Sequence, residues 1–171
     1  MLLLNSPIIG HLIQKLEGTK ENISFVRVDG DSTENLIKKD DSAVSKLSEE
    51  EKETLKPMIE AVVKEGGYTV QMEAMDSQAL PFVLTQPEFM RRMKEMQQTG
   101  GGGMMMGNMP DMYNLIVNTN HELVSQILAT KTEKKRERLI QQAVDLARLS
   151  KNLLKGEEMT QFIKRSVDLI K

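Results

Sequence analysis

The chain has 171 residues, a formal net charge of -2, and 39% hydrophobic but only 4% aromatic residues, which is enough for one domain or two small ones. The absence of cysteine excludes disulfides, thiolate metal sites and cysteine nucleophiles, and the balanced charge gives no basis for nucleic acid binding. No apolar run approaches the roughly 18 residues of a membrane-spanning helix, so we expect a cytoplasmic protein with no membrane partner.

The first part of the chain predicts one helix, one short strand and a polar connection. Ser6 and Pro7 place a capping hydroxyl before a proline at the first helical position, and apolar residues recur at helical spacing until Gly18. Residues 23–28 are typical of a strand that ends in a turn, and residues 31–46 are polar with weak patterning. Since the chain begins inside an apolar run, we expect it to be a fragment of a longer protein.

A second helix is predicted to begin after Ser48. Ser48 and Glu51 have the spacing of a capping box, and acidic residues in the first turn suit the positive end of the helix dipole. The helix should run to Glu65, with Pro57 as a possible kink. Its inward stripe is predicted to be Leu55, Met58, Ile59, Val62 and Val63.

Three segments have the patterns of strands. Residues 68–73 alternate apolar and polar side chains, which is the period of a half-buried strand, and residues 81–84 and 112–117 are further candidates. Short strands interspersed with helices predict the α+β class, with a small mixed sheet packed by helices.

A methionine-rich segment lies between the second and third strand candidates, at residues 85–110. Thr85 and Glu88 have capping-box spacing, which predicts an amphipathic helix over residues 85–97, and a glycine- and methionine-rich run follows. Flexible thioethers suit the binding of many different apolar partners. The candidate contact residues are Phe89, Met90, Met93, Met96, Met104, Met105 and Met106. The alternative, that the methionines of the helix are ordinary core, remains open.

The last fifty residues predict three helices, over 122–128, over 132–155 with Gly156 as the terminator, and over 157–171. The apolar faces of the last two are broad, and pairing with a second copy would form a four-helix bundle. The residues expected at this homodimer interface are Leu139, Ile140, Ala143, Leu146, Ala147, Leu153, Leu154, Phe162, Ile163, Ser166, Leu169 and Ile170. Packing of the same stripes on the chain's own sheet is an equally good interpretation of the periodicity alone.

No catalytic or metal-binding constellation is apparent. His11 and His121 are far apart in the sequence, without a second ligand at metal-binding spacing. The four glycines at 100–103 lack the lysine and hydroxyl residue of a phosphate loop. We therefore expect no enzyme activity, metal or cofactor in this chain.

The order of several segments resembles the end of the bacterial ninety-kilodalton heat-shock chaperones, the high-temperature protein G family. The segments are residues 2–8 (LLLNSPI), 16–18 (LEG), 54–59 (TLKPMI), 76–83 (DSQALPFV) and 117–121 (VNTNH). The last is similar to an Asn-Pro-x-His signature, with Thr119 in place of the proline.

The resemblance implies that residues 1–40 are the end of a middle domain and 41–171 a dimerisation domain, with a client-contact helix containing Phe89, Met90, Met93 and Met96. It implies a homodimer that acts on unfolded or partly folded client proteins in the stress response. ATP and magnesium binding would belong to an N-terminal domain of the parent protein. Gly10 and His11 stand where the family has an acidic-aromatic client-contact pair. The alternative is a purely structural oligomerisation module without client contact.

Overall fold

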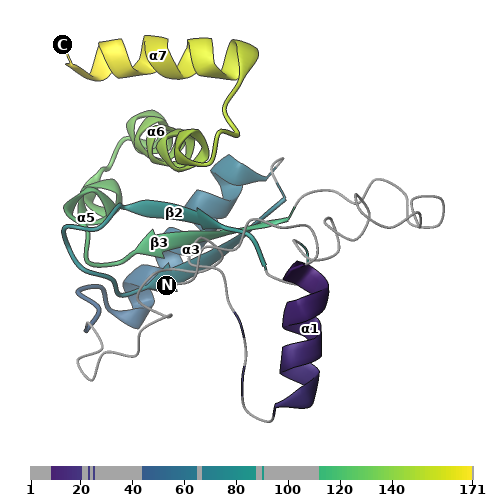
Figure 1. Cartoon of the computed structure of the whole chain (residues 1–171). Coiled ribbons are helices and arrows are strands. Elements are labelled where there is room, and N and C mark those ends of the chain that lie inside the picture. Colours follow the sequence, from purple (N-terminus) through teal and green to yellow (C-terminus); the bar gives the residue numbers. More distant parts are fainter. Residues whose placement is uncertain are drawn as a thin grey trace.

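The computed structural model describes residues 9–20, 23, 25, 44–64, 67–87, 90 and 112–170. Along the chain these residues form α1 (Ile9–Thr19), α3 (Glu49–Val63), β1 (Tyr68–Glu73), β2 (Phe82–Thr85), β3 (Tyr113–Asn118), α5 (Glu122–Ala129), α6 (Glu133–Ser150) and α7 (Gly156–Ile170) (Figure 1). The predicted first helix is confirmed as α1, whereas most of the predicted strand at 23–28 lies outside the described residues.

The three strands form one mixed sheet in the order β1-β3-β2, which confirms the predicted α+β class. β3 is the central strand and pairs with β1 in parallel and with β2 antiparallel, so that Leu115 lies opposite both Val70 and Leu84. The central position agrees with the burial of three successive residues, Leu115, Ile116 and Val117, because a central strand covered on both faces loses the polar alternation of an edge strand.

Helices α3 and α6 pack on one face of the sheet, and α7 lies outside α6, so that α6 is sandwiched between the sheet and α7 (Figure 1). The capping box of α3 is formed as predicted, with Glu51 N–H donating to Ser48 Oγ at 3.3 Å and Ser48 N–H donating to the Glu51 carboxylate at 2.8 Å. The helix continues through Pro57 and buries Leu55 and Ile59 completely. The core that these layers share consists of Leu47, Leu55, Ile59, Val63, Val70, Phe82, Leu84, Leu115, Val117, Val124, Ile127, Ile140, Ala143, Val144 and Ala147.

The prediction of one helix over 132–155 closed by Gly156 is wrong. α6 ends at Ser150, and Asn152 adopts a left-handed conformation with φ 57°. The N–H of Leu153 donates to the Arg148 carbonyl and the N–H of Asn152 to the Leu149 carbonyl, both at 3.0 Å. These two bonds are the Schellman arrangement, in which asparagine can replace the usual glycine. Gly156, also with a positive φ, instead begins α7.

The predicted helix over 85–97 does not begin where its capping pattern indicated. Thr85 is the last residue of β2 and is buried, and Gln86 and Pro87 are not helical. The strand extends one residue beyond the predicted end because Thr85 pairs with Asn114 of β3. Met90 is helical, and residues 88–89 and 91–111 lie outside the described part of the chain.

Candidate partner-binding surface

Helix α7 carries an exposed row of apolar side chains on the outside of the molecule. Ile163, Val167 and Ile170 follow one another at intervals of four and three residues and are 54%, 49% and 85% exposed, and Leu169 is 52% exposed beside them. This spacing places the three residues on one face of the helix. Phe162, the single buried residue of α7, lies about 100° around the helix from Ile163, and Leu169, seven residues after Phe162, lies on the side of Phe162. We call Ile163, Val167 and Ile170 the outer stripe.

The predicted dimer residues divide into two groups in the structure. Ile140, Ala143 and Ala147 belong to the core of the single chain, with Leu139 and Leu153 packed against it. These five residues therefore pack in or against the core of their own chain, and the interpretation that α6 packs on its own sheet applies to the four of them that lie on α6. Leu154 and Phe162 are also buried, whereas Leu146, Ile163, Leu169 and Ile170 are exposed.

Val167 belongs to this surface but was not among the residues predicted from the sequence. The sequence spacing indicates that Val167 shares a helix face with Ile163 and Ile170, since it lies four residues after the first and three before the second. Ser166, which was predicted at the interface, is half-buried and bonded within the chain: it accepts a hydrogen bond from Gln142 Nε2 at 2.7 Å and donates to the Phe162 carbonyl at 2.9 Å.

A polar layer joins α7 to α6 beneath the outer stripe. Asp145 of α6 is only 2% exposed, and its carboxylate accepts hydrogen bonds from Gln141 Nε2 at 3.1 Å and Arg148 Nη1 at 3.2 Å, and from Arg165 Nη2 of α7. Arg148 reaches across to Glu158 in the first turn of α7 with Nη2 at 2.8 and 2.7 Å from the two carboxylate oxygens. These ion pairs connect the two helices at two separate points along α7.

The environment of this layer shifts the pKa of Arg148 and that of Tyr68. Burial is the largest single effect on Arg148 and disfavours its charged form, but the hydrogen bond to Glu158 and the charges of Tyr68, Glu158 and Asp145 together outweigh it, and the pKa of Arg148 is raised. Burial also raises the pKa of the Tyr68 hydroxyl, against the opposing effect of the Arg148 charge. This polar layer was not predicted from the sequence. The available signal was Asp145, a charged residue placed among the buried residues Ala143, Val144 and Ala147.

The segment Asn118-Thr119-Asn120-His121, which carried the most specific family resemblance, forms a buried turn after β3. Asn118 Oδ1 accepts hydrogen bonds from the N–H groups of Met75 and Asn120, and its Nδ2 donates to the Asp76 carbonyl at 2.7 Å. His121 caps α5, since its Nδ1 accepts the N–H of Leu123 at 3.0 Å. The signature residues therefore hold the turn between the sheet and the C-terminal helices.

Comparison with known proteins identifies relatives across almost the whole chain. Chaperone protein HtpG of Porphyromonas gingivalis is 37% identical over 136 residues, which are 78% of this chain and 20% of that protein. The HtpG proteins of Bacteroides fragilis and Bacteroides thetaiotaomicron are 27% identical over 237 residues, which cover 99% of this chain and 35% of each protein. The chain is homologous to the C-terminal part of HtpG.

The resemblance to the bacterial ninety-kilodalton heat-shock chaperones is thus confirmed, although no protein-family model matches the chain. The chain spans only 20% to 35% of the length of these HtpG relatives. Since the alignment with the Bacteroides proteins, 237 residues, is longer than the chain itself, those relatives have residues in the matched region that this chain lacks.

Most of the residues expected to contact clients fall outside the described residues. These are Phe89, Met93, Met96, Met104, Met105 and Met106. Met90 is the exception, and it is helical and half-buried. Gly10 and His11, which the family resemblance placed at a second expected client contact, are both exposed on α1.

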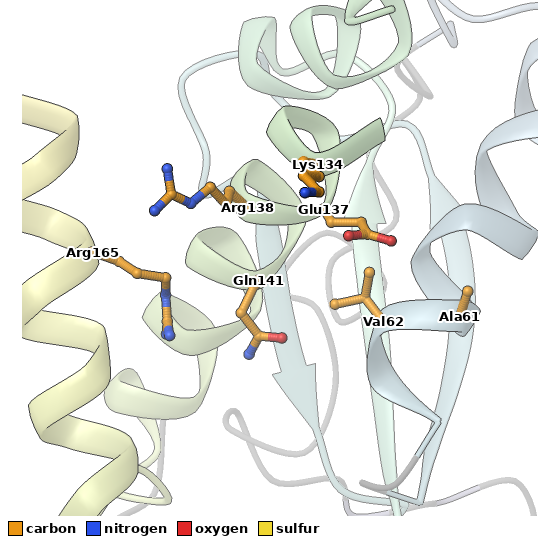
Figure 2. Close-up of a pocket in the computed structure, with 7 residues that line it drawn as sticks. All are labelled: Ala61, Val62, Lys134, Glu137, Arg138, Gln141 and Arg165. Carbon is orange, nitrogen blue, oxygen red and sulfur yellow. The ribbon is translucent and has the colours of Figure 1, made fainter. Parts of the chain in front are cut away.

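A shallow pocket of about 450 Å³ lies among α3, α6 and α7, and Figure 2 shows the residues that line it. Lys134, Arg138 and Arg165 contribute positive charge, Glu137 contributes one negative charge, and Ala61 and Val62 add apolar surface. The pocket contains no nucleophile paired with a base, and no residue predicted from the sequence as a site lines it.

Across the described ranges, no helix has both the length and the apolar character needed to cross a lipid bilayer. Nor do the residues that the structure places include a group of three or more histidine, aspartate, glutamate or cysteine side chains able to hold a metal ion.

Proposed function

We propose that this chain is the dimer-forming and client-contacting C-terminal region of an ATP-dependent chaperone that binds unfolded or partly folded proteins. The observation that carries the dimer is the outer stripe, because a row of exposed apolar side chains on the outermost helix is a surface that association would cover. The naming of the relatives as chaperones supports the wider role.

The proposed interface is narrower than the one expected from the sequence. It consists of the outer stripe together with Leu146, which is 46% exposed on α6. Covering an apolar side chain that is already about half buried contributes roughly 1 kcal/mol, and a two-fold interface counts each contact residue twice. The two C-terminal helices of each copy would then form a four-helix bundle in which α6 also serves the core of its own subunit.

Client contact is proposed for the methionine-rich segment, residues 85–110, through Phe89, Met90, Met93, Met96 and the methionines at 104–106. The support is compositional, since thioether side chains adapt to apolar partners of different shape. In the same proposal residues 1–40 end a middle domain, residues 41–171 form the dimerisation domain, and ATP with magnesium binds elsewhere in a cytoplasmic parent protein. The alternative is a structural oligomerisation module whose methionines are purely core.

Sedimentation equilibrium of the chain tests the dimer directly. We expect a dimer at micromolar concentration for the natural sequence and a monomer for Ile163→Asp, which places a carboxylate in the outer stripe. Gln161→Asp is the matched control, because it adds the same charge at an exposed polar position of the same helix and should remain dimeric. A monomeric natural chain, or equal dissociation of the two variants, would contradict the proposed interface.

A further inference from the structure

Asp145 is the one ionisable side chain that is buried within the described part of the chain, and nothing in the proposed dimer surface requires it. Its two carboxylate oxygens have different partners. Oδ1 accepts hydrogen bonds from Gln141 and Arg148 of its own helix, whereas Oδ2 accepts from Arg165 of α7. Figure 2 shows the Arg165 side chain extending from α7 toward α6 beside Gln141.

The ion pairs hold α7 at two points rather than one. Arg148 binds Glu158 in the first turn of α7, and Arg165 binds Asp145 about two turns later, roughly 10 Å along the helix axis. The hydrogen bond between Gln142 and Ser166 lies next to the second point. A helix that is held at two separated points cannot pivot, so these contacts define the direction of α7 across α6.

Apolar packing by itself would leave this direction poorly defined. Phe162 is the only residue of α7 that is buried, and apolar burial is non-directional. The ion pairs are also a poor source of stability, because desolvation of buried charges offsets most of their attraction. In addition, Arg148 Nε and Arg165 Nε are buried without a hydrogen-bond partner among the described residues. The network therefore contributes orientation more than it contributes free energy of folding.

We propose that Asp145 is a positioning residue: with Arg165, Arg148 and Glu158 it holds α7 in one orientation on α6 and so aligns the outer stripe for a second copy of this chain. This inference rests on the proposed dimer. It predicts that removal of an ion pair beneath the stripe weakens dimerisation even though no interface side chain has changed.

The test compares Arg165→Met, which keeps the aliphatic stem but removes the charge, with Arg165→Lys and with Lys164→Met. Lys164 is an exposed cation on the same helix and provides a control for the loss of one positive charge. We expect Arg165→Met to raise the dimer Kd at least tenfold, Lys164→Met to change it less than threefold, and Arg165→Lys to recover most of the affinity.

Hydrogen exchange of the α7 amides gives a second readout that does not depend on dimerisation. Measured in the monomeric Ile163→Asp background, Arg165→Met should lower the protection of α7 at least tenfold while the amides of β3 keep theirs. A purely stabilising role would instead lower the protection of α7 and β3 together. Glu158→Gln, at a side chain that is 55% exposed, should lower the protection of the α7 amides by about threefold. This variant takes the place of Arg165→Met in the test if Arg165→Met fails to fold.

The outcomes separate the two proposals. If the natural chain is a dimer and Arg165→Met leaves both its Kd and the protection of α7 unchanged, the positioning role is wrong and the dimer stands. If the natural chain is monomeric, the proposed dimer fails, and the exchange of α7 alone decides whether the ion pairs hold the helix.

Discussion

Replacement of Asn118 by alanine tests whether the turn after β3 holds the fold together, as its hydrogen bonds indicate. The Asn118 side chain is fully buried and serves two backbone donors and one acceptor: the N–H groups of Met75 and Asn120 at 3.2 and 3.0 Å, and the Asp76 carbonyl at 2.7 Å. Alanine would leave the N–H groups of the buried residues Met75 and Asn120 without this acceptor, whereas the carbonyl of Asp76, an exposed residue, still accepts a hydrogen bond from the N–H of Ala79 at 3.0 Å. Each N–H group left in this way costs about 1–3 kcal/mol.

Because small rearrangements and an entering water would satisfy part of this loss, we expect Asn118→Ala to lower the free energy of unfolding by about 2–4 kcal/mol. This is a large share of the roughly 5–15 kcal/mol by which a domain of ordinary size is stable. Urea unfolding followed by circular dichroism measures the change, with the slope m expected to remain constant.

Asn114→Ala is the matched control, since Asn114 lies on the same strand and is half-buried. Among the described residues its side chain makes no hydrogen bond, so its replacement should cost less than about 1 kcal/mol. If Asn118→Ala were no more destabilising than Asn114→Ala, the hydrogen bonds of the turn would not stabilise the domain, and the structural account of this signature segment would be wrong.

Three further outcomes are expected. His121→Ala removes the cap of α5 and should cost about 1 kcal/mol in urea unfolding, whereas His121→Ser should retain most of the stability; equal losses would refute the capping role. Gly156→Ala should cost about 1–2 kcal/mol through the backbone alone, because φ is 57° and no atom would lie within 4 Å of the added methyl group; an unchanged midpoint would show that this conformation is not strained. In the full-length chaperone, Met93→Ser combined with Met96→Ser should weaken the suppression of client aggregation without affecting dimerisation, and unchanged suppression would argue against client contact by this segment.

Local patterns in the sequence were sufficient to predict most of the secondary structure. The capping box at Ser48 and the alternation around Val70 each depend on neighbours within a few residues. The local sequence is therefore sufficient to predict the start of α3 and the strand β1. The end of α6 shows where such information is ambiguous. Asn152 and Gly156 can both adopt a positive φ, and in the structure both do, with α6 ending before Asn152 and Gly156 starting the next helix. Nothing local distinguishes a terminating residue from a starting one when two candidates lie four residues apart.

The sequence by itself determined the α+β class, the central elements and the amphipathic character of α6 and α7, because periodicity states which side chains share a face. Only the tertiary structure decided what covers each face. Ile140 and Ala143 meet the sheet of their own chain, Ile163 and Ile170 remain exposed, and Asp145 is buried against Arg165. Those outcomes depend on how elements that are distant in the sequence pack against one another, and the periodicity of a single segment does not specify that packing.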